Sequence, residues 1–271
     1  MDPRLQRRVQ RYGWDLAADR YEASWQAPLA PAQRALLGAA QLRPGERVLD
    51  VACGTGLVAF AAAEAMGPSG RVLGVDVSAR MVEAARRQAD TRFVSNAAFE
   101  RMDGEALALA DGSVDVALCA LGLMYMPEPE RAIAELHRVL RPGGRLALAV
   151  WGERGRCGWS ALFDIVDAEV ASEVCPLFFR LGTGSALAEA CAEAGFADVT
   201  SARIDAPFEH ADDAAACSAA FEAGPVALAW SRFNAETRER VQRRYLEALK
   251  AHGASGGYRI PGEFVVTTAR C

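Results

Sequence analysis

A glycine-rich stretch and one carboxylate give this chain the groups best suited to binding a cofactor. Arg47-Val-Leu-Asp-Val-Ala-Cys-Gly-Thr-Gly56 is followed, twenty residues after its last glycine, by the carboxylate of Gly74-Val-Asp76. Gly54 and Gly56 let the backbone turn tightly against a ligand, and Asp76 can accept hydrogen bonds from both hydroxyls of a ribose. The spacing predicts a nucleotide-like cofactor site.

The charge of Asp50 discriminates between two cofactor chemistries. The stretch from Gly54 to Ala59 matches the dinucleotide fingerprint in its alanine form. A dinucleotide would bring a doubly anionic pyrophosphate to this loop, where Asp50 would repel it. S-adenosylmethionine carries no phosphate but has a sulfonium and an ammonium group. An acid at position 50 therefore favours S-adenosylmethionine.

The stretch Val-Leu-Asp-Val-Ala-Cys-Gly-Thr-Gly, taken with Gly-Val-Asp76, resembles the cofactor motifs of class I S-adenosylmethionine-dependent methyltransferases. Ala52 stands where most members have their first glycine, but alanine is familiar there in the ubiquinone and menaquinone biosynthesis type, the methyltransferase type 11 branch. The resemblance implies an α/β, Rossmann-like fold. Its seven-stranded, mostly parallel sheet would carry helices on both faces, an N-terminal helical extension and helical lid insertions.

The resemblance also implies a set of cofactor contacts on the loops that follow the strands. Asp76 would bind the ribose, and Asp103 would accept a hydrogen bond from the adenine amino group, with a polar turn as the alternative. Tyr21 would close over the methionine end, and Met81 would lie under the adenine, with core packing as the alternative for both. The full set is Tyr21, Asp50, Ala52, Cys53, Gly54, Gly56, Asp76, Val77, Met81, Asp103, Gly104, Cys119 and Leu121.

The hydrophobic pattern predicts the elements that must position these residues. We expect strands at 47–51, 71–75, 98–102, within 110–119, and at 145–151, 198–208 and 264–269. Helices are expected at 57–65, 79–89, 129–140 and 187–194, with Ser78 capping the second. Arg141-Pro-Gly-Gly144 is typical of a helix stop followed by a tight turn. The last strand should insert antiparallel beside the fifth.

The organisation expected is a single methyltransferase domain over residues 1–271. Residues 1–40 would form the helical extension, 41–152 the cofactor-binding core, and 153–271 the remaining sheet. Two insertions, at about 153–184 and about 209–260, would form substrate lids.

Composition narrows the class of protein further. A net charge of −5 argues against a nucleic-acid partner, and the arginines near the N-terminus are expected to form a solvated helix face. No apolar run reaches membrane-spanning length, and no signal peptide is recognisable. Seven cysteines without metal-ligand spacing predict free thiols, no bound metal and a cytoplasmic location. The oligomeric state stays open.

The expected reaction is methyl transfer to an oxygen, carbon or nitrogen of a small organic molecule. Apolar lids and the absence of a phosphate-binding patch favour an aromatic or quinone-like acceptor. A base is needed for a hydroxyl or an activated carbon, but not for a nucleophile that is already anionic. No catalytic residue is identified by motif. His210, after the sixth strand, and Tyr125, after the fourth, are the candidates.

Two alternatives remain open at this point. Cys157 and Cys175, in the first insertion, could bind a soft thiophilic substrate such as arsenite or a thiol. The alternative is that both are small buried hydrophobic side chains, as free cysteines commonly are. Tyr125, Trp159 and Phe178 complete the expected substrate contacts. The chain could also bind the cofactor without turnover.

Overall fold

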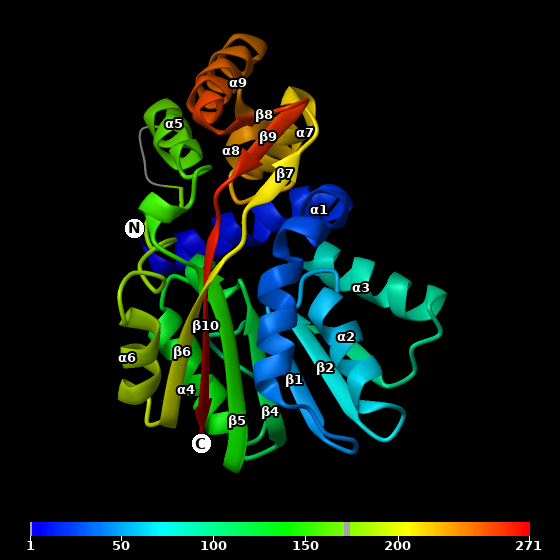
Figure 1. The fold of residues 1–271 in the computed structure, drawn as a ribbon. Coiled ribbons are helices and arrows are strands. Elements are labelled where there is room, and N and C mark those ends of the chain that lie inside the picture. The colour runs from blue at the N-terminus through cyan, green and yellow to red at the C-terminus, as the bar shows by residue number, and fades with distance from the viewer. Residues whose placement is uncertain (1, 171–173) are drawn as a thin grey trace.

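The computed structural model describes residues 2–170 and 174–271 and has a seven-stranded sheet at its centre (Figure 1). The strand order is β3-β2-β1-β4-β5-β10-β6. Neighbouring strands from β3 to β5 are parallel, whereas β10 lies antiparallel to both β5 and β6. The predicted mostly parallel sheet and the antiparallel insertion of its last strand are confirmed.

The strands that carry the candidate site are almost completely buried. In β1, β2 and β4 nearly every residue is covered, as expected for parallel strands with helices on both faces. The bounds of the sheet strands are β1 (Arg47–Val51), β2 (Arg71–Asp76), β3 (Ala97–Arg101), β4 (Val114–Ala120), β5 (Leu140–Trp151), β6 (Ala197–Asp205) and β10 (Glu263–Arg270).

Helices cover both faces of the sheet, as predicted (Figure 1). The C-terminal half of α1 (Pro3–Ala40), α2 (Leu57–Met66) and α3 (Ala79–Thr91) lie on one side, and α4 (Pro129–Val139) and α6 (Ala186–Glu193) on the other. Ser78 caps α3, since its hydroxyl accepts a hydrogen bond from the amide of Met81 at 3.1 Å. The predicted cap is therefore confirmed.

The helix α1 fills the whole predicted N-terminal extension and changes direction along its length. Pro28 and Pro31 lie inside it, and proline removes a helical hydrogen bond and kinks the axis. Its N-terminal half crosses above the edge of the sheet, while its C-terminal half packs against the sheet (Figure 1). No helix among the described residues, α1 included, is long and apolar enough to cross a membrane.

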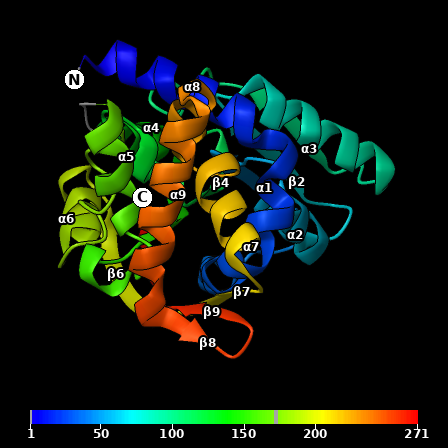
Figure 2. The ribbon, with the colours of Figure 1, turned by 90° about the horizontal axis from the view of Figure 1, so that it is seen from above.

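A second, smaller sheet stands above the carboxyl edge of the first, and the sequence does not predict it (Figures 1 and 2). It joins β7 (Phe208–His210), β9 (Gly257–Ile260) and β8 (Gly253–Ala254), in that order. The strand expected at 198–208 instead ends at Asp205. Pro207 follows it, and proline cannot donate to a strand ladder.

The remaining helical elements of the described residues are all shorter than α1. They are α5 (Ala161–Val170), α7 (Asp213–Cys217), the π-helix η3 (Ser218–Glu222), α8 (Ala227–Arg232), α9 (Ala235–Leu249) and the 3-10 turns η1 (Leu123–Tyr125), η2 (Arg154–Arg156) and η4 (Lys250–His252). The segment 209–260 is thus mostly helical, as expected, but also supplies three strands. Residues 171–173 of the segment 153–184 lie outside the described residues.

The turn expected at 141–144 is the bulged beginning of a strand. β5 starts at Leu140, directly after α4, and its pairing with β4 shifts register between Val114 and Val116. Gly143 has a φ of +72°, which glycine adopts without strain and which suits a bulge.

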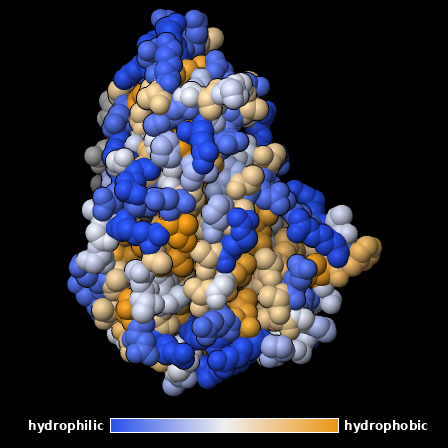
Figure 3. Space-filling model, in the orientation of Figure 1, coloured by the Kyte–Doolittle hydropathy of each residue, from blue (hydrophilic) through white to orange (hydrophobic). Residues whose placement is uncertain are grey.

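The molecular face in the orientation of Figure 1 carries no single large apolar area. Figure 3 shows hydrophilic residues spread over this face, with hydrophobic ones lying between them.

Candidate functional site

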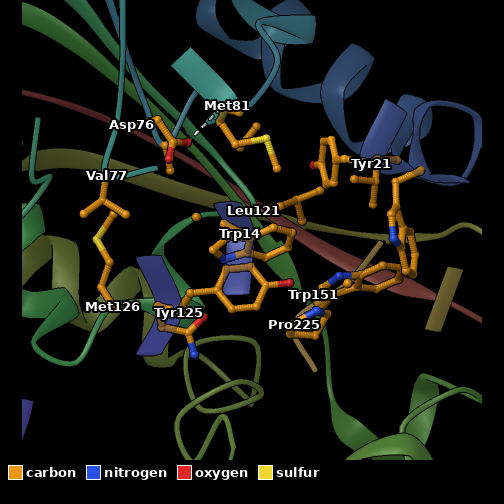
Figure 4. A pocket seen from close by; sticks show the side chains of 18 of the residues that line it. Trp14, Tyr21, Asp76, Val77, Met81, Leu121, Tyr125, Met126, Trp151 and Pro225 are labelled. Atoms are coloured by element: carbon orange, nitrogen blue, oxygen red, sulfur yellow. Dashed lines mark hydrogen bonds between the residues drawn. The ribbon is translucent and has the colours of Figure 1, made fainter. Parts of the chain in front are cut away.

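A cavity lies where the parallel strands end. The space in it that the centre of a water molecule can reach is about 110 Å³, and part of the cavity is open to solvent. Its floor consists of residues that end or directly follow β1, β2, β3, β4 and β5, and its walls come from α1 and from the elements above the sheet. Figure 4 shows Asp76 and Met81 towards one side of the cavity and Trp151 and Pro225 towards the other. Ligands of open α/β sheets bind at this edge.

The loop after β1 turns sharply and reaches across to β2. Ala52, Gly54 and Gly56 have φ values of +56°, +54° and +92°. The Gly54 amide donates to Oδ2 of Asp76 at 2.9 Å. Because this hydrogen bond ties the loop to the next strand, the turn and the carboxylate at the end of β2 form one unit.

Asp76 lies at the cavity with both carboxylate oxygens already accepting one backbone bond. Oδ1 accepts from the Ser78 amide at 2.9 Å, as Oδ2 does from Gly54, so each oxygen keeps capacity for a ligand hydroxyl. Burial raises the pKa of Asp76 to about 6, and the two backbone bonds limit the rise. The carboxyl group is therefore charged at neutral pH.

Asp50 lies beneath the same loop and does not line the cavity. Its side chain is completely buried, and neither carboxylate oxygen accepts a hydrogen bond of normal length and angle from the described residues, although the Ala59 amide is near enough to favour the charged form. Burial, and next the charge of Asp76, raise the pKa of Asp50 to about 8. A buried acid without a counter-charge would be stabilised in its charged form by a nearby cation, but not by an anion.

At the same end of the cavity, Arg7 of α1 forms ion pairs with two further carboxylates, those of Asp103 and Glu105. Nε of Arg7 lies 2.9 Å from Oδ2 of Asp103, and Nη2 lies 2.5 Å from Glu105, whose side chain is 1% exposed. Arg7 lines the cavity, so the expected role of this arginine in a solvated face is wrong. Neither Arg7 nor Glu105 belongs to a sequence motif.

The loop after β4 packs directly on the loop after β1. Leu121 has a φ of +64°, and its amide donates to the Ala149 carbonyl at 2.7 Å. A Cβ placed on Gly122 would lie only 2.3 Å from the Ala52 methyl and 3.0 Å from Sγ of Cys119. The glycine is required because the two loops approach so closely.

Three aromatic rings meet in the middle of the cavity (Figure 4). Trp14 makes edge contacts with Tyr21 and Tyr125, at centroid distances of 5.7 and 4.9 Å. Trp14 belongs to none of the sequence motifs described above and is not among the expected site residues. Its spacing of seven residues from Tyr21, two helical turns, is the signal that places both on one face of α1.

The far end of the cavity is aromatic, and the imidazole of His210 is the one acidic or basic side chain that the described residues place there. Trp151 lies 4.9 Å from Trp159 and 6.0 Å from Phe208, whose ring is 5.5 Å from His210. Burial lowers the pKa of His210, so its imidazole is neutral at neutral pH. The rest of this end consists of Trp25, Leu29, Leu162, Ala219, Ala220, Gly224, Pro225 and Tyr245.

The structure thus brings most of the expected site residues to one cavity. Those that line it are Tyr21, Ala52, Gly54, Asp76, Val77, Met81, Asp103, Gly104, Leu121, Tyr125, Trp159 and His210. Those expected residues that do not line it are Asp50, Cys53, Gly56, Cys119, Cys157, Cys175 and Phe178. Phe178 contacts Tyr125 from behind, at a centroid distance of 5.3 Å.

The two thiols expected to contact a soft substrate are buried instead. Cys175 accepts a hydrogen bond from the Gln10 side chain at 3.4 Å, and Cys157 contacts the Glu263 carbonyl. Burial raises the pKa of Cys157 to about 11 and that of Cys175 to about 12. Both therefore stay protonated at neutral pH, whereas a soft metal or metalloid binds the thiolate.

The sequence of this chain is similar to those of known methyltransferases. A family model described as a methyltransferase domain matches residues 42–175. A ubiquinone/menaquinone biosynthesis C-methyltransferase of Methylobacterium nodulans is 34% identical over 200 residues, which cover 69% of this chain and 77% of that protein. The chain belongs to the class I S-adenosylmethionine-dependent methyltransferases. The nocamycin O-methyltransferase of Saccharothrix syringae is 29% identical over 258 residues, 90% of this chain and 91% of that protein.

Two further proteins are similar to this methyltransferase over different shares of its length. An uncharacterised 37.1 kDa protein from a transposon of Streptomyces fradiae is 40% identical over 185 residues, 66% of this chain, and the chain spans about half (51%) of that protein. The crystal structure of the YcgJ protein from Bacillus subtilis superposes with a TM-score of 0.64 at 19% identity, covering 89% of this chain and 98% of that one. This likeness establishes the shared fold.

The residues of the cavity fit S-adenosylmethionine, the cofactor of the family. Asp50, beneath the cavity floor, is a buried acid without a cationic partner among the described residues, and Asp76 keeps acceptor capacity at the end of β2. No cluster of three or more potential metal ligands occurs among the described residues. An excess of acid beneath the β1 loop suits a cationic cofactor and opposes a pyrophosphate.

Proposed function

We propose that this methyltransferase methylates a small, apolar, aromatic or quinone-like molecule. The observation that carries the proposal is the far end of the cavity, where Trp151, Trp159 and Phe208 form an aromatic wall. A charged acceptor would lose its hydration there without gaining an ionic partner. A flat apolar acceptor would instead gain burial and ring contacts.

The cofactor would lie along the edge of the sheet with its ribose on Asp76. Asp103 would accept from the adenine amino group while Arg7 holds that carboxylate in place. Met81 and Tyr21 would contact the adenine and methionine ends, and Asp50 would act through space on the positive charge. S-adenosylmethionine supplies an electrophilic methyl group, and the chain's own task is to align an acceptor with it and exclude water.

For a hydroxyl acceptor we assign His210 the role of general base. It lines the aromatic end, and burial keeps its ring neutral, so one ring nitrogen can take the proton of a phenol or enol. The similarity to a protein named nocamycin O-methyltransferase, which extends over 90% of this chain, supports oxygen as the acceptor atom. Tyr125, at the junction with the cofactor end, would orient the ring of the acceptor.

The elements above the sheet would act as the lid of this single domain. Ala219, Ala220 and Pro225 line the cavity from η3 and the following loop, and Leu162 does so from α5. These residues come from the two predicted insertions. The cavity depends on them because the sheet alone leaves the acceptor end open to water.

The test is methyl transfer from labelled S-adenosylmethionine to a panel of phenols, hydroxyquinones, amines, thiols and arsenite. We expect turnover of hydroxylated aromatic compounds, and a His210→Gln variant should lose about 10²- to 10⁴-fold in kcat/KM for them. His252→Gln, a histidine outside the cavity lining, is the matched control. An Asp76→Asn variant should fail to bind S-adenosylhomocysteine in calorimetry, which separates loss of cofactor from loss of the base.

Two results would overturn the proposal. Turnover confined to arsenite or thiols would point to Cys157 and Cys175 after a rearrangement of their surroundings. Cofactor binding without turnover of any compound in the panel would indicate a protein that keeps the fold without the reaction.

A further inference from the structure

The outer face of α1 exposes apolar side chains in a single row. Among the described residues, large hydrophobic side chains are exposed at Leu5, Tyr12, Leu16 and Phe93, and the first three lie on α1 with exposures of 42%, 47% and 51%. At about 100° per residue these three fall within about 40° of each other around the helix. They form a row about 16 Å long, at 1.5 Å of rise per residue.

A basic groove runs beside this row. It is lined by Arg4, Arg7, Arg8 and Arg11 of α1 and by Arg101 at the end of β3. Arg7 is paired with acids, as described above, but the other four guanidinium groups have no carboxylate partner among the described residues. The row and the groove together are named the α1 outer surface, defined by Arg4, Leu5, Arg8, Arg11, Tyr12, Leu16 and Arg101.

The nearest acidic side chains of α1 have partners outside this groove. Asp15 accepts hydrogen bonds from the Ser78 hydroxyl and the Arg80 amide, and Asp19 pairs with the Arg80 guanidinium. Asp2 caps the start of the helix. The chain as a whole has a net charge of −5, so this surface is a local exception.

The opposite face of the same helical segment lines the cavity. Arg7, Gln10 and Trp14 point inward, whereas Leu5, Tyr12 and Leu16 are exposed. The groove and the cavity share four lining residues, which are Arg7, Val77, Met102 and Asp103. The outer surface therefore lies on the other side of one helix from the site.

We propose that the α1 outer surface docks the protein onto the surface of a bilayer that contains anionic lipids. Four arginines without a carboxylate partner among the described residues complement the negative headgroups, although Arg101 also donates to the Val77 carbonyl and Arg11 stacks on the Tyr12 ring. A row of leucine and tyrosine can enter the boundary between headgroups and acyl chains. A row one side chain wide on a convex helix offers a protein partner far less than the roughly 800 Å² per side of a stable interface. Charge complementarity and shape thus both favour a lipid surface.

Sedimentation with vesicles tests the proposal on the full chain. The wild type should bind vesicles of 30% phosphatidylglycerol in phosphatidylcholine, but not pure phosphatidylcholine, and 0.5 M salt should release it. Arg4→Gln/Arg8→Gln/Arg11→Gln should weaken binding by about 10- to 100-fold. Leu5→Ser/Tyr12→Ser/Leu16→Ser should weaken it by about tenfold or more, because three inserted apolar side chains are lost.

Matched controls separate this surface from net charge and from exposed apolar groups in general. Arg34→Gln/Arg87→Gln/Arg232→Gln changes the net charge equally at exposed arginines that make no ion pair with the described residues, and Phe93→Ser removes a side chain that is 93% exposed. Both controls should bind as the wild type does. Circular dichroism and S-adenosylhomocysteine affinity should be unchanged in all variants, because none of the substituted side chains lines the cavity.

The proposal is independent of the methyl acceptor. Equal binding to neutral and anionic vesicles, no binding to either, or equal loss in the control variants would overturn it. Binding to polyglutamate without binding to vesicles would overturn it in favour of an acidic protein partner.

Discussion

At the scale of single residues, two non-glycine residues of the site have a left-handed backbone conformation that L-amino acids rarely adopt. Ala52 and Leu121 both have positive φ, which costs a non-glycine residue about 1–2 kcal/mol. Both line the cavity, and the two loops that contain them are in contact at Gly122. Strain of this kind gathers where the backbone must approach a ligand.

Exchanging the two small residues tests whether this contact is specific. Gly122→Ala should lower the free energy of unfolding by about 1–3 kcal/mol, because its Cβ would lie 2.3 Å from the Ala52 methyl. In the double variant Ala52→Gly/Gly122→Ala that methyl is gone, so much of the loss should be recovered. Urea denaturation of the wild type, the two single variants and the double variant gives a double-mutant cycle. Strict additivity of the two effects would show that the loops are not coupled through these atoms.

Asp50 predicts a pH dependence of the protein without cofactor. Burial raises its folded pKa to about 8, so the folded state binds this proton more readily than the unfolded state does. The contribution of Asp50 to stability therefore falls as the pH rises towards and through its folded pKa, by about 1 kcal/mol between pH 7 and pH 9. Asp50→Asn should lack this component in urea denaturation, while the exposed control Asp19→Asn should retain it. An identical pH dependence in wild type and Asp50→Asn would contradict the assignment.

At the scale of elements, α1 forms one wall of the acidic end of the cavity. Its N-terminal half contributes Arg7 to the ion pairs with Asp103 and Glu105, and Asp15 to the hydroxyl of Ser78 at 2.6 Å. The helix thus contacts the residues after β2 and β3 that are expected to hold the cofactor. Its docking and cofactor binding should be coupled.

Arg7→Met tests this coupling while preserving the length of the side chain. Glu105 would lose its cation while 1% exposed, so stability should fall by about 1–2 kcal/mol. Amide exchange should accelerate in the N-terminal half of α1, and affinity for S-adenosylhomocysteine should decrease. Arg20→Gln, which breaks an ion pair between α1 and Glu222 with an arginine 62% exposed, is the control and should change neither. Unchanged exchange in Arg7→Met would show that α1 is held by apolar packing alone.

At the scale of the whole molecule, the two ends of the cavity belong to different parts of the fold. The cofactor end is built from loops of the large sheet, whereas His210 and Phe208 belong to the small sheet above it. Phe208 pairs with Ile260, and His210 with Tyr258. The acceptor end therefore depends on pairing between distant segments of the chain.

Gly257→Ala should separate the two ends functionally. A Cβ at this position would lie 2.1 Å from the His210 carbonyl and 2.7 Å from that of Ala211, so β7 and β9 must shift apart. We expect kcat/KM to fall about 10- to 100-fold through misplacement of the acceptor. The affinity for S-adenosylhomocysteine, measured by calorimetry, should stay within about twofold. Gly155→Ala, whose Cβ meets nothing within 4 Å, is the control. Parallel loss of both activity and cofactor affinity would mean that the ends are not separable.

The sequence by itself determined the large sheet and the motif residues at its edge. Buried strands have continuous apolar runs, and the turn after β1 needs glycine at fixed positions, so Gly54, Asp76 and the Ser78 cap are readable from local spacing. Only the tertiary structure decided the places of Arg7 and Trp14, the β7-β9 pairing, and the exclusion of Cys157 and Cys175 from the cavity lining. These depend on which distant segments pack together, and local hydrophobic periodicity does not encode the partner that a helix face or a short strand meets.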